Sequence, residues 1–291
     1  MKLLSNTPIA LTVLPALLAI WSATPCLGGT KVHLGQNVPE SQRLSMDQID
    51  HQDWNTLLKR YVDANGNVNY TAWQSSAADV QTLDRYLAQL SAAAPQSQTS
   101  DAARLAFWIN AYNAVTIRGI LREYPTTSIR NHTAKLFGYN IWKDLLLTVG
   151  GEPYSLDQIE HQLLRKLGEP RIHFAIVCAS RSCPRLMAEA YTADKLEFQL
   201  TSNTKAFFAN SGNFRYNPAR QTFHLSSILD WFGEDFGRDD AALLRTIAPY
   251  LPTREAYDAA MTVSSSPSLS YLAYDWRLND QATAATPSRP N

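Results

Sequence analysis

The segment from Leu105 to Pro125 constrains the fold more than any other part of this chain, because it is apolar around nearly its whole circumference. A helix of that kind must be enclosed by other elements, so we expect it to be a buried central helix. Asn110 and Asn113 lie about 60° apart around that helix, so both amides project together. A buried amide is costly unless it is hydrogen-bonded, so the two side chains either hold a neighbouring loop, which is the commoner case, or bind a substrate.

Short runs with strand-like composition predict hairpins around this helix. Asn65-Gly66, Gly150-Gly151 and Asn217-Pro218 each lie between two such runs, at turn residues that favour a tight reversal of the chain. The chain therefore predicts the α+β class. We expect the buried central helix, surrounding helices and a largely antiparallel sheet built from hairpins.

The N-terminal residues have the character of a signal peptide. Lys2 is followed by an apolar stretch from Ile9 to Trp21, which is shorter than the roughly 20 residues that span a bilayer, and then by small residues. We expect an exported protein, periplasmic or secreted, with a signal peptide at 1–28, a polar segment at 29–50, a single globular domain at 51–279 and a disordered tail at 280–291. Lipoprotein anchoring through Cys26 is disfavoured because Pro25 stands where a small residue is needed.

The charge balance argues against nucleic acid as a partner. Lys plus Arg and Asp plus Glu each number 26, whereas proteins that neutralise phosphates carry an excess of basic residues. No second long apolar run exists, so we expect no integral membrane span in the mature chain. The sequence has no dinucleotide, P-loop, serine-hydrolase or zincin motif and no zinc-ligand spacing, so it predicts no cofactor and no metal. A small-molecule or peptide ligand fits best, and the oligomeric state stays open.

Cys183 is the clearest candidate for chemistry. Pro184 favours the first position of a helix, which would place Cys183 at the N-cap beside unpaired backbone N–H groups. Arg181 and Arg185 flank it, and such surroundings lower a thiol pKa and give a reactive thiolate. Cys178 precedes it by five positions, so in an oxidising compartment the two could instead form a disulfide.

Two segments supply candidate partners for this cysteine. Arg171–Cys178 predicts a buried strand in which His173 is the one strongly polar interior residue. A capping box at Ser155 predicts a helix through Leu167, on which Glu160 falls inside the apolar stripe and His161 at its edge. A carboxylate aimed at a core needs a partner or a raised pKa, so Glu160 is either catalytic or binding, or part of a buried ion pair. The arginines that could pair with it are Arg118, Arg130, Arg171 and Arg181.

Four ordered motifs resemble the domain of unknown function 547 family. They are FWINAYNAVTIRGI, SLDQIEHQLLR, RIHFAIVCASRSCPRL and YLAYDWRLND, and the resemblance extends from about Trp54 to Asn279. The family includes exported bacterial proteins, and the chain resembles those members. The resemblance implies no settled activity and no chemical roles. The positions that match its motifs are Asn110, Asn113, Glu160, His161, His173 and Cys183.

Three functions are compatible with these residues. In the first, Cys183 is the nucleophile, His173 or His161 its base, and Glu160 or an asparagine orients the imidazole, which gives a cysteine-dependent hydrolase or acyltransferase. Its substrate would be peptide, amide or cell-envelope material, bound by Asn110, Asn113 and Arg181. The second is a non-catalytic binding or scaffold domain with a structural polar network. The third is a structural or redox-active disulfide, which the spacing disfavours because it is not CxxC.

Overall fold

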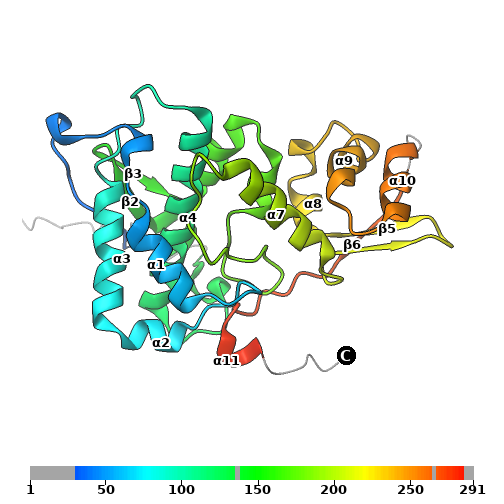
Figure 1. The fold of residues 1–291 in the computed structure, drawn as a ribbon. Helices are drawn as coiled ribbons and strands as arrows, with labels where there is room; N and C mark the ends of the chain where they lie inside the picture. The colour runs from blue at the N-terminus through cyan, green and yellow to red at the C-terminus, as the bar shows by residue number, and fades with distance from the viewer. Residues whose placement is uncertain (1–29, 135–137, 264–266, 285–291) are drawn as a thin grey trace, which may run out of the picture.

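The computed structural model describes residues 30–134, 138–263 and 267–284 (Figure 1). The predicted signal peptide lies outside these residues. The helices are α1 Gln52–Tyr61, α2 Tyr70–Ser75, α3 Ala77–Leu90, α4 Asp101–Glu123, α5 Ile141–Asp144, α6 Leu156–Gln158, α7 Leu196–Ala209, α8 Ser227–Trp231, α9 Asp240–Ile247, α10 Arg254–Thr262 and α11 Gln281–Ala284. The strands are β1 Val32–Leu34, β2 Leu145–Val149, β3 Glu152–Ser155, β4 Phe214–Asn217, β5 Thr222–Ser226 and β6 Ser268–Leu272. None of the helices described is long and apolar enough to span a bilayer.

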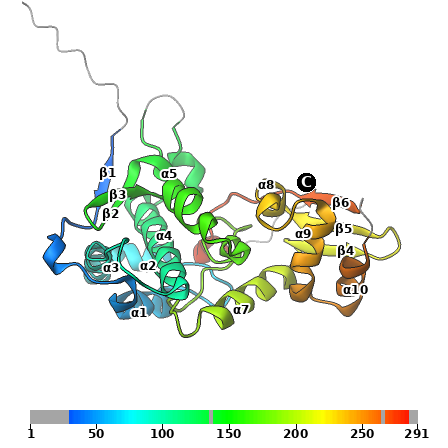
Figure 2. The same cartoon turned by 90° about the horizontal axis from the view of Figure 1, so that it is seen from above.

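The central helix is α4, as predicted. The Ser100 side chain accepts a hydrogen bond from the Ala103 N–H and so begins the helix, and nearly every residue from Ala103 to Leu121 is buried. Figures 1 and 2 show α4 surrounded by α1, α2 and α3 and by the strand β2. The α+β class is confirmed, and the enclosed helix explains why this segment has no polar face.

The sheets are small and mixed. The predicted hairpins at 145–154 and 214–225 are present as β2–β3 and β4–β5, but β1 joins β2 in parallel and β6 joins β5 in parallel. The turn at Asn65-Gly66 forms without a ladder, since Val62 and Val68 make one isolated bridge. A largely antiparallel sheet is therefore wrong in detail, because each hairpin gains a third strand from a distant part of the chain.

The hydrophobic interior is divided into two clusters. The larger surrounds α4, and the smaller lies among β4–β6, α8, α9 and α10, with α7 extending between the two groups (Figure 2). Met46 and Ile49, from the segment predicted to be polar, are buried in the larger cluster. The tail predicted from residue 280 is wrong for residues 280–284, since Asp280 is buried and α11 follows it.

The strand predicted at Arg171–Cys178 is absent. Residues Pro170–Phe174 form a 3-10 helix, which Glu169 begins by accepting a hydrogen bond from the Arg171 N–H. The chain after it needs no neighbouring strand, because the Asn113 amide accepts a hydrogen bond from the Val177 N–H at 2.9 Å and donates one to the Ala175 carbonyl at 2.9 Å. A side chain thus replaces the ladder that the composition suggested.

We expect Asn113→Ala to lower the free energy of unfolding by about 2–4 kcal/mol, because it leaves a buried N–H and a buried carbonyl without partners. Urea denaturation measures the change. The control is Asn131→Ala, which removes an exposed amide and should alter stability by less than about 0.5 kcal/mol. Equal effects of the two substitutions would contradict the role of Asn113.

Candidate functional site

The candidate site is a cavity of about 270 Å³ between the two hydrophobic clusters. It brings together residues that are far apart in the sequence, from α4, the segment after α6, the cysteine loop, α8 and the chain after β6. Its polar and reactive lining residues include Glu160, His161, His173, Cys178, Cys183 and Tyr274. Four of these are the residues that the sequence predicted as catalytic.

Cys183 sits in an irregular loop that several hydrogen bonds hold in place. The Cys178 backbone N–H donates to Cys183 Sγ at 3.0 Å, and the Tyr274 hydroxyl oxygen lies 3.2 Å from the same sulfur. Ser180 Oγ donates to the Tyr274 oxygen at 2.9 Å, which leaves the Tyr274 proton available to the sulfur. Ala179, within this loop, has a φ of 56°, a left-handed conformation that costs a non-glycine residue about 1–3 kcal/mol.

These contacts give the two thiols opposite properties. Burial alone raises the pKa of Cys183, but hydrogen bonds from Cys178, Ser180 and Tyr274 outweigh it and lower that pKa to about 6. The pKa of Cys178 is raised well above its usual value by its hydrogen bond to Cys183 and by burial. Both cysteines are unlinked. The disulfide stays a prediction, and Cys183 is the sulfur that carries the charge.

The predicted helix after Pro184 is absent, so the helix dipole does not act on Cys183. The flanking arginines are also engaged elsewhere. Arg181 donates to the Thr283 carbonyl, and Arg185 donates to Asn203 Oδ1 at 2.8 Å. The low pKa of Cys183 was anticipated, but its cause is direct hydrogen bonding to the sulfur rather than a helix N-terminus.

Glu160 faces the cavity without an arginine partner. It lies in a π-helical turn, Ile159–Leu164, and accepts a hydrogen bond from the Tyr112 hydroxyl at 3.1 Å. Burial raises the pKa of this carboxyl, although the charge of His161 opposes the rise. The predicted Glu–Arg pair is therefore wrong. Arg118, for example, is bound to Asp84 at 2.6 Å.

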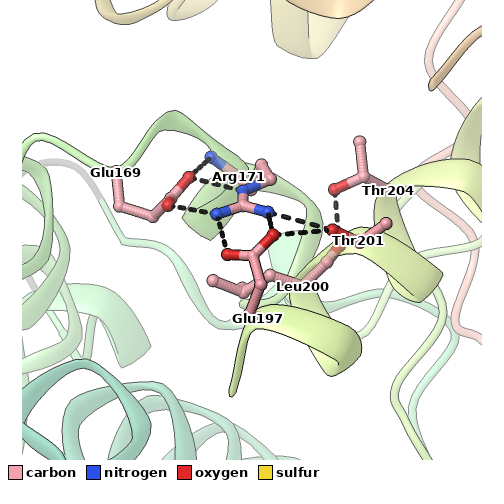
Figure 3. Close-up of polar contacts among 6 residues, drawn as sticks. All are labelled: Glu169, Arg171, Glu197, Leu200, Thr201 and Thr204. Atoms are coloured by element: carbon pink, nitrogen blue, oxygen red, sulfur yellow. Dashed lines mark hydrogen bonds and ion pairs between the residues drawn. The ribbon is translucent and has the colours of Figure 1, made fainter. Parts of the chain in front are cut away.

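Arg171, a second proposed partner of Glu160, instead fixes the segment that carries His173. It pairs with Glu169 at 2.6 Å and with Glu197 of α7 at 2.7 Å (Figure 3). Its guanidinium also donates to Thr201 at 3.0 Å. These bonds join the 3-10 helix to α7 and so help to position His173 at the cavity.

His173 is held by a carboxylate that the sequence did not single out. Its Nε2 lies 2.7 Å from Asp235 Oδ2, its ring stacks on Phe232 with 4.3 Å between centroids, and its side chain is only 1% exposed. Burial lowers the pKa of His173, while Asp235 acts in the opposite direction. Arg165 also binds Asp235, at 2.6 Å. The imidazole is therefore oriented and largely neutral near pH 7.

His161 lies at the rim, 3.3 Å from an Arg165 nitrogen. In the part of the chain that the structure describes, neither His161 nor His173 is hydrogen-bonded to a cysteine sulfur. The expected Cys–His pair is thus not formed, although both imidazoles line the cavity that Cys183 lines.

Asn110 and Asn113 do not line the cavity, and both bind loop backbone. Asn110 donates to the Tyr191 carbonyl at 2.8 Å and accepts from the Tyr191 N–H at 2.9 Å, and Asn113 is saturated in the same way. Both are buried and hold the two ends of the loop that contains the cysteines. The structural alternative, which the sequence favoured, accounts for both amides.

Sequence reasoning missed one side of the cavity. Trp142, Trp231, Tyr274 and Trp276 form an aromatic wall, in which the Tyr274 and Trp276 rings lie 4.5 Å apart and the Trp231 and Trp276 rings 5.7 Å. The motif YLAYDWRLND, which contains Tyr274 and Trp276, was the only signal for this wall. Within residues 30–134, 138–263 and 267–284, no three His, Cys, Asp or Glu side chains cluster as a metal site would require.

Comparison with known families agrees with the motifs. Residues 96–208 match the family model described as "Protein of unknown function, DUF547". The matched segment, residues 96–208, therefore belongs to this family. The DUF547 match contains Glu160, His161, His173 and Cys183, whereas Tyr274 and Asp235 lie beyond it. No curated protein and no solved structure matches the chain.

We expect alkylation of Cys183 by iodoacetamide to accelerate as the pH rises through about 6, because the thiolate is the reacting form. Tyr274→Phe removes one donor to the sulfur, so it should raise the pKa of Cys183 and slow alkylation at pH 6 by about tenfold. Peptide mapping of rates against pH measures both. An unchanged profile in Tyr274→Phe would show that the hydroxyl does not stabilise the thiolate.

Proposed function

We propose that this DUF547 protein is a cysteine-dependent hydrolase or acyltransferase that acts on peptide, amide or cell-envelope material. One observation carries the proposal: a thiol whose pKa is lowered to about 6 lines a cavity together with a carboxyl whose pKa is raised and an oriented imidazole. A cleft that holds one group with a lowered pKa and another with a raised pKa is typical of acid–base and nucleophilic catalysis.

In the first step, the Cys183 thiolate attacks the carbonyl carbon, a C–S bond forms, and the π electron pair moves to the oxygen. The Tyr274 hydroxyl and the Cys178 N–H, which stabilise the thiolate before attack, lie close enough to follow the negative charge to that oxygen. The C–N bond then breaks. Glu160, whose pKa is raised by burial, in its protonated form gives its proton to the departing amine.

In the second step, water or another nucleophile attacks the thioester. His173, held by Asp235, or the Glu160 carboxylate accepts the proton of that nucleophile. The C–S bond breaks, and the electron pair returns to the Cys183 sulfur. Water gives hydrolysis and an amine gives acyl transfer, so the same residues serve both reactions.

A non-catalytic binding domain is the alternative, and one observation favours it. Two buried amides, Asn110 and Asn113, each bind both a donor and an acceptor of the loop backbone. A binding domain needs such clamps, but it does not need a thiol with a lowered pKa beside a carboxyl with a raised pKa.

An exported location is part of the proposal. The support is the apolar stretch from Ile9 to Trp21 followed by small residues. N-terminal sequencing of the protein from its native host, in separated cell fractions, tests it. An intact N-terminus in the cytoplasmic fraction would contradict export.

We expect p-nitrophenyl esters to leave an acyl group on Cys183 that intact-mass spectrometry and peptide mapping detect. Cys183→Ser should abolish both the adduct and the release of p-nitrophenol. Glu160→Gln should slow peptide-amide cleavage by about 100-fold or more and affect the esters much less, because p-nitrophenolate leaves without a proton. Comparing esters with amides thus distinguishes the role of Cys183 as nucleophile from the role of Glu160 as general acid.

The controls keep the outcomes distinct. Each variant must retain the thermal unfolding midpoint of the wild type, so that lost activity reflects chemistry. If Cys183 alkylates rapidly near pH 6 and yet never acquires an acyl group from esters or amides, the enzyme proposal is rejected in favour of the binding domain.

A further inference from the structure

Cys183 borders a second hollow with a different chemical character. This hollow has a volume of about 600 Å³, and it lies among the turn near Asn65, the cysteine loop and the C-terminal part of α7. Its lining residues include Arg181, Arg185 and the amides of Asn65, Asn67, Asn210 and Asn213, and none is acidic. The first cavity, in contrast, is lined by aromatic rings and by side chains of both charge types, the carboxyls of Asp157 and Glu160 beside Lys143 and two histidines.

The two arginines are held without a carboxylate. Arg185 donates to Asn203 Oδ1 at 2.8 Å and to Ser202 Oγ at 3.4 Å, and Arg181 donates to the Thr283 carbonyl. Neither forms an ion pair among the described residues, whereas Arg60, Arg118 and Arg171 do. Asp275, whose pKa the charge of Arg181 helps to lower, is itself paired with Arg277.

Neutral partners fix each guanidinium and leave both its charge and part of its donor capacity unused. A guanidinium has five N–H groups in a planar fork that matches a carboxylate. Gly66 shows how closely the hollow is built, since a Cβ at this position would lie 2.5 Å from the Arg185 Cα. The turn therefore packs directly against the arginine backbone and holds it beside Cys183.

We propose that this hollow binds a carboxylate of the substrate, so that the acyl group transferred to Cys183 belongs to a dicarboxylic acid or to a peptide with a nearby free carboxylate. Arg181 and Arg185 bind the carboxylate, and Cys183, between the two hollows, attacks the neighbouring carbonyl. The inference rests on the proposed function and names its substrate class.

Two alkylating reagents of nearly equal size test the inference without any turnover. Iodoacetate carries a carboxylate, and iodoacetamide carries a neutral amide in the same place. We expect Arg181→Met and Arg185→Met each to lower the ratio of the iodoacetate rate to the iodoacetamide rate at Cys183 by about tenfold. The iodoacetamide rate corrects for any change in the pKa of Cys183, and Arg181→Lys should restore part of the ratio.

Succinate supplies a second measurement. It should slow iodoacetamide labelling of Cys183 in the wild type and have no effect in the two methionine variants, and its protection should weaken with added salt. Arg215→Met, which removes an exposed arginine of β4, is the matched control and should leave the ratio unchanged. An unchanged ratio in both hollow variants, or an equal change in Arg215→Met, would overturn the carboxylate site.

The outcome separates this inference from the proposed function. If iodoacetate is preferred over iodoacetamide but no acyl adduct ever forms on Cys183, the carboxylate site is supported and the proposed acyl transfer is rejected. An acyl adduct that forms equally well from p-nitrophenyl acetate and from the p-nitrophenyl monoester of succinic acid would keep the enzyme and reject its carboxylate specificity.

Discussion

The candidate site depends on two amide side chains of one buried helix. Asn110 and Asn113 each pair with both a donor and an acceptor of the loop backbone, at Tyr191 and at Ala175 and Val177. The chain between these points has little regular secondary structure. Its position is therefore fixed by the side chains of α4 rather than by backbone hydrogen bonds to a neighbouring strand. The loop that carries the cysteines is therefore anchored to a helix that is buried along most of its length.

The pKa of Cys183 results from a competition between burial and donors. Burial favours the neutral thiol, and the donors at the sulfur reverse that preference. Most of these donors are neutral, so the thiolate forms without an imidazolium beside it. His173 is hydrogen-bonded to Asp235 instead of to the sulfur. The thiolate and the histidine are thus tuned separately, which differs from a nucleophile activated by an adjacent imidazole. The left-handed conformation of Ala179 is the strain that this arrangement requires.

Sequence patterns predicted the elements that are determined by residues close together in the chain. The apolar circumference of 105–125 identified α4, and turn residues identified the two hairpins, because both signals act within a few residues. The strand predicted at 171–178 failed because its backbone partner is Asn113, which lies 62 and 64 residues away from the groups it binds. Glu160, His173 and Cys183 were recognised as reactive residue types in unusual surroundings. Tyr274 and Asp235 were not, because their importance arises only where they meet Cys183 and His173 in space.

The boundary of the DUF547 match separates the reactive groups from two of the residues that tune them, Tyr274 and Asp235. The matched residues 96–208 supply the nucleophile, Glu160 and His173, whereas Trp231, Asp235 and Tyr274 lie beyond the match. The imidazole thus takes its orientation from a residue beyond the match, whereas the thiol is stabilised from both sides of its boundary, by Cys178 and Ser180 within the match and by Tyr274 beyond it. A change in how the two clusters meet would therefore alter reactivity without changing any of the matched motif residues, since Tyr274 and Asp235 reach the thiol and the imidazole from beyond the match.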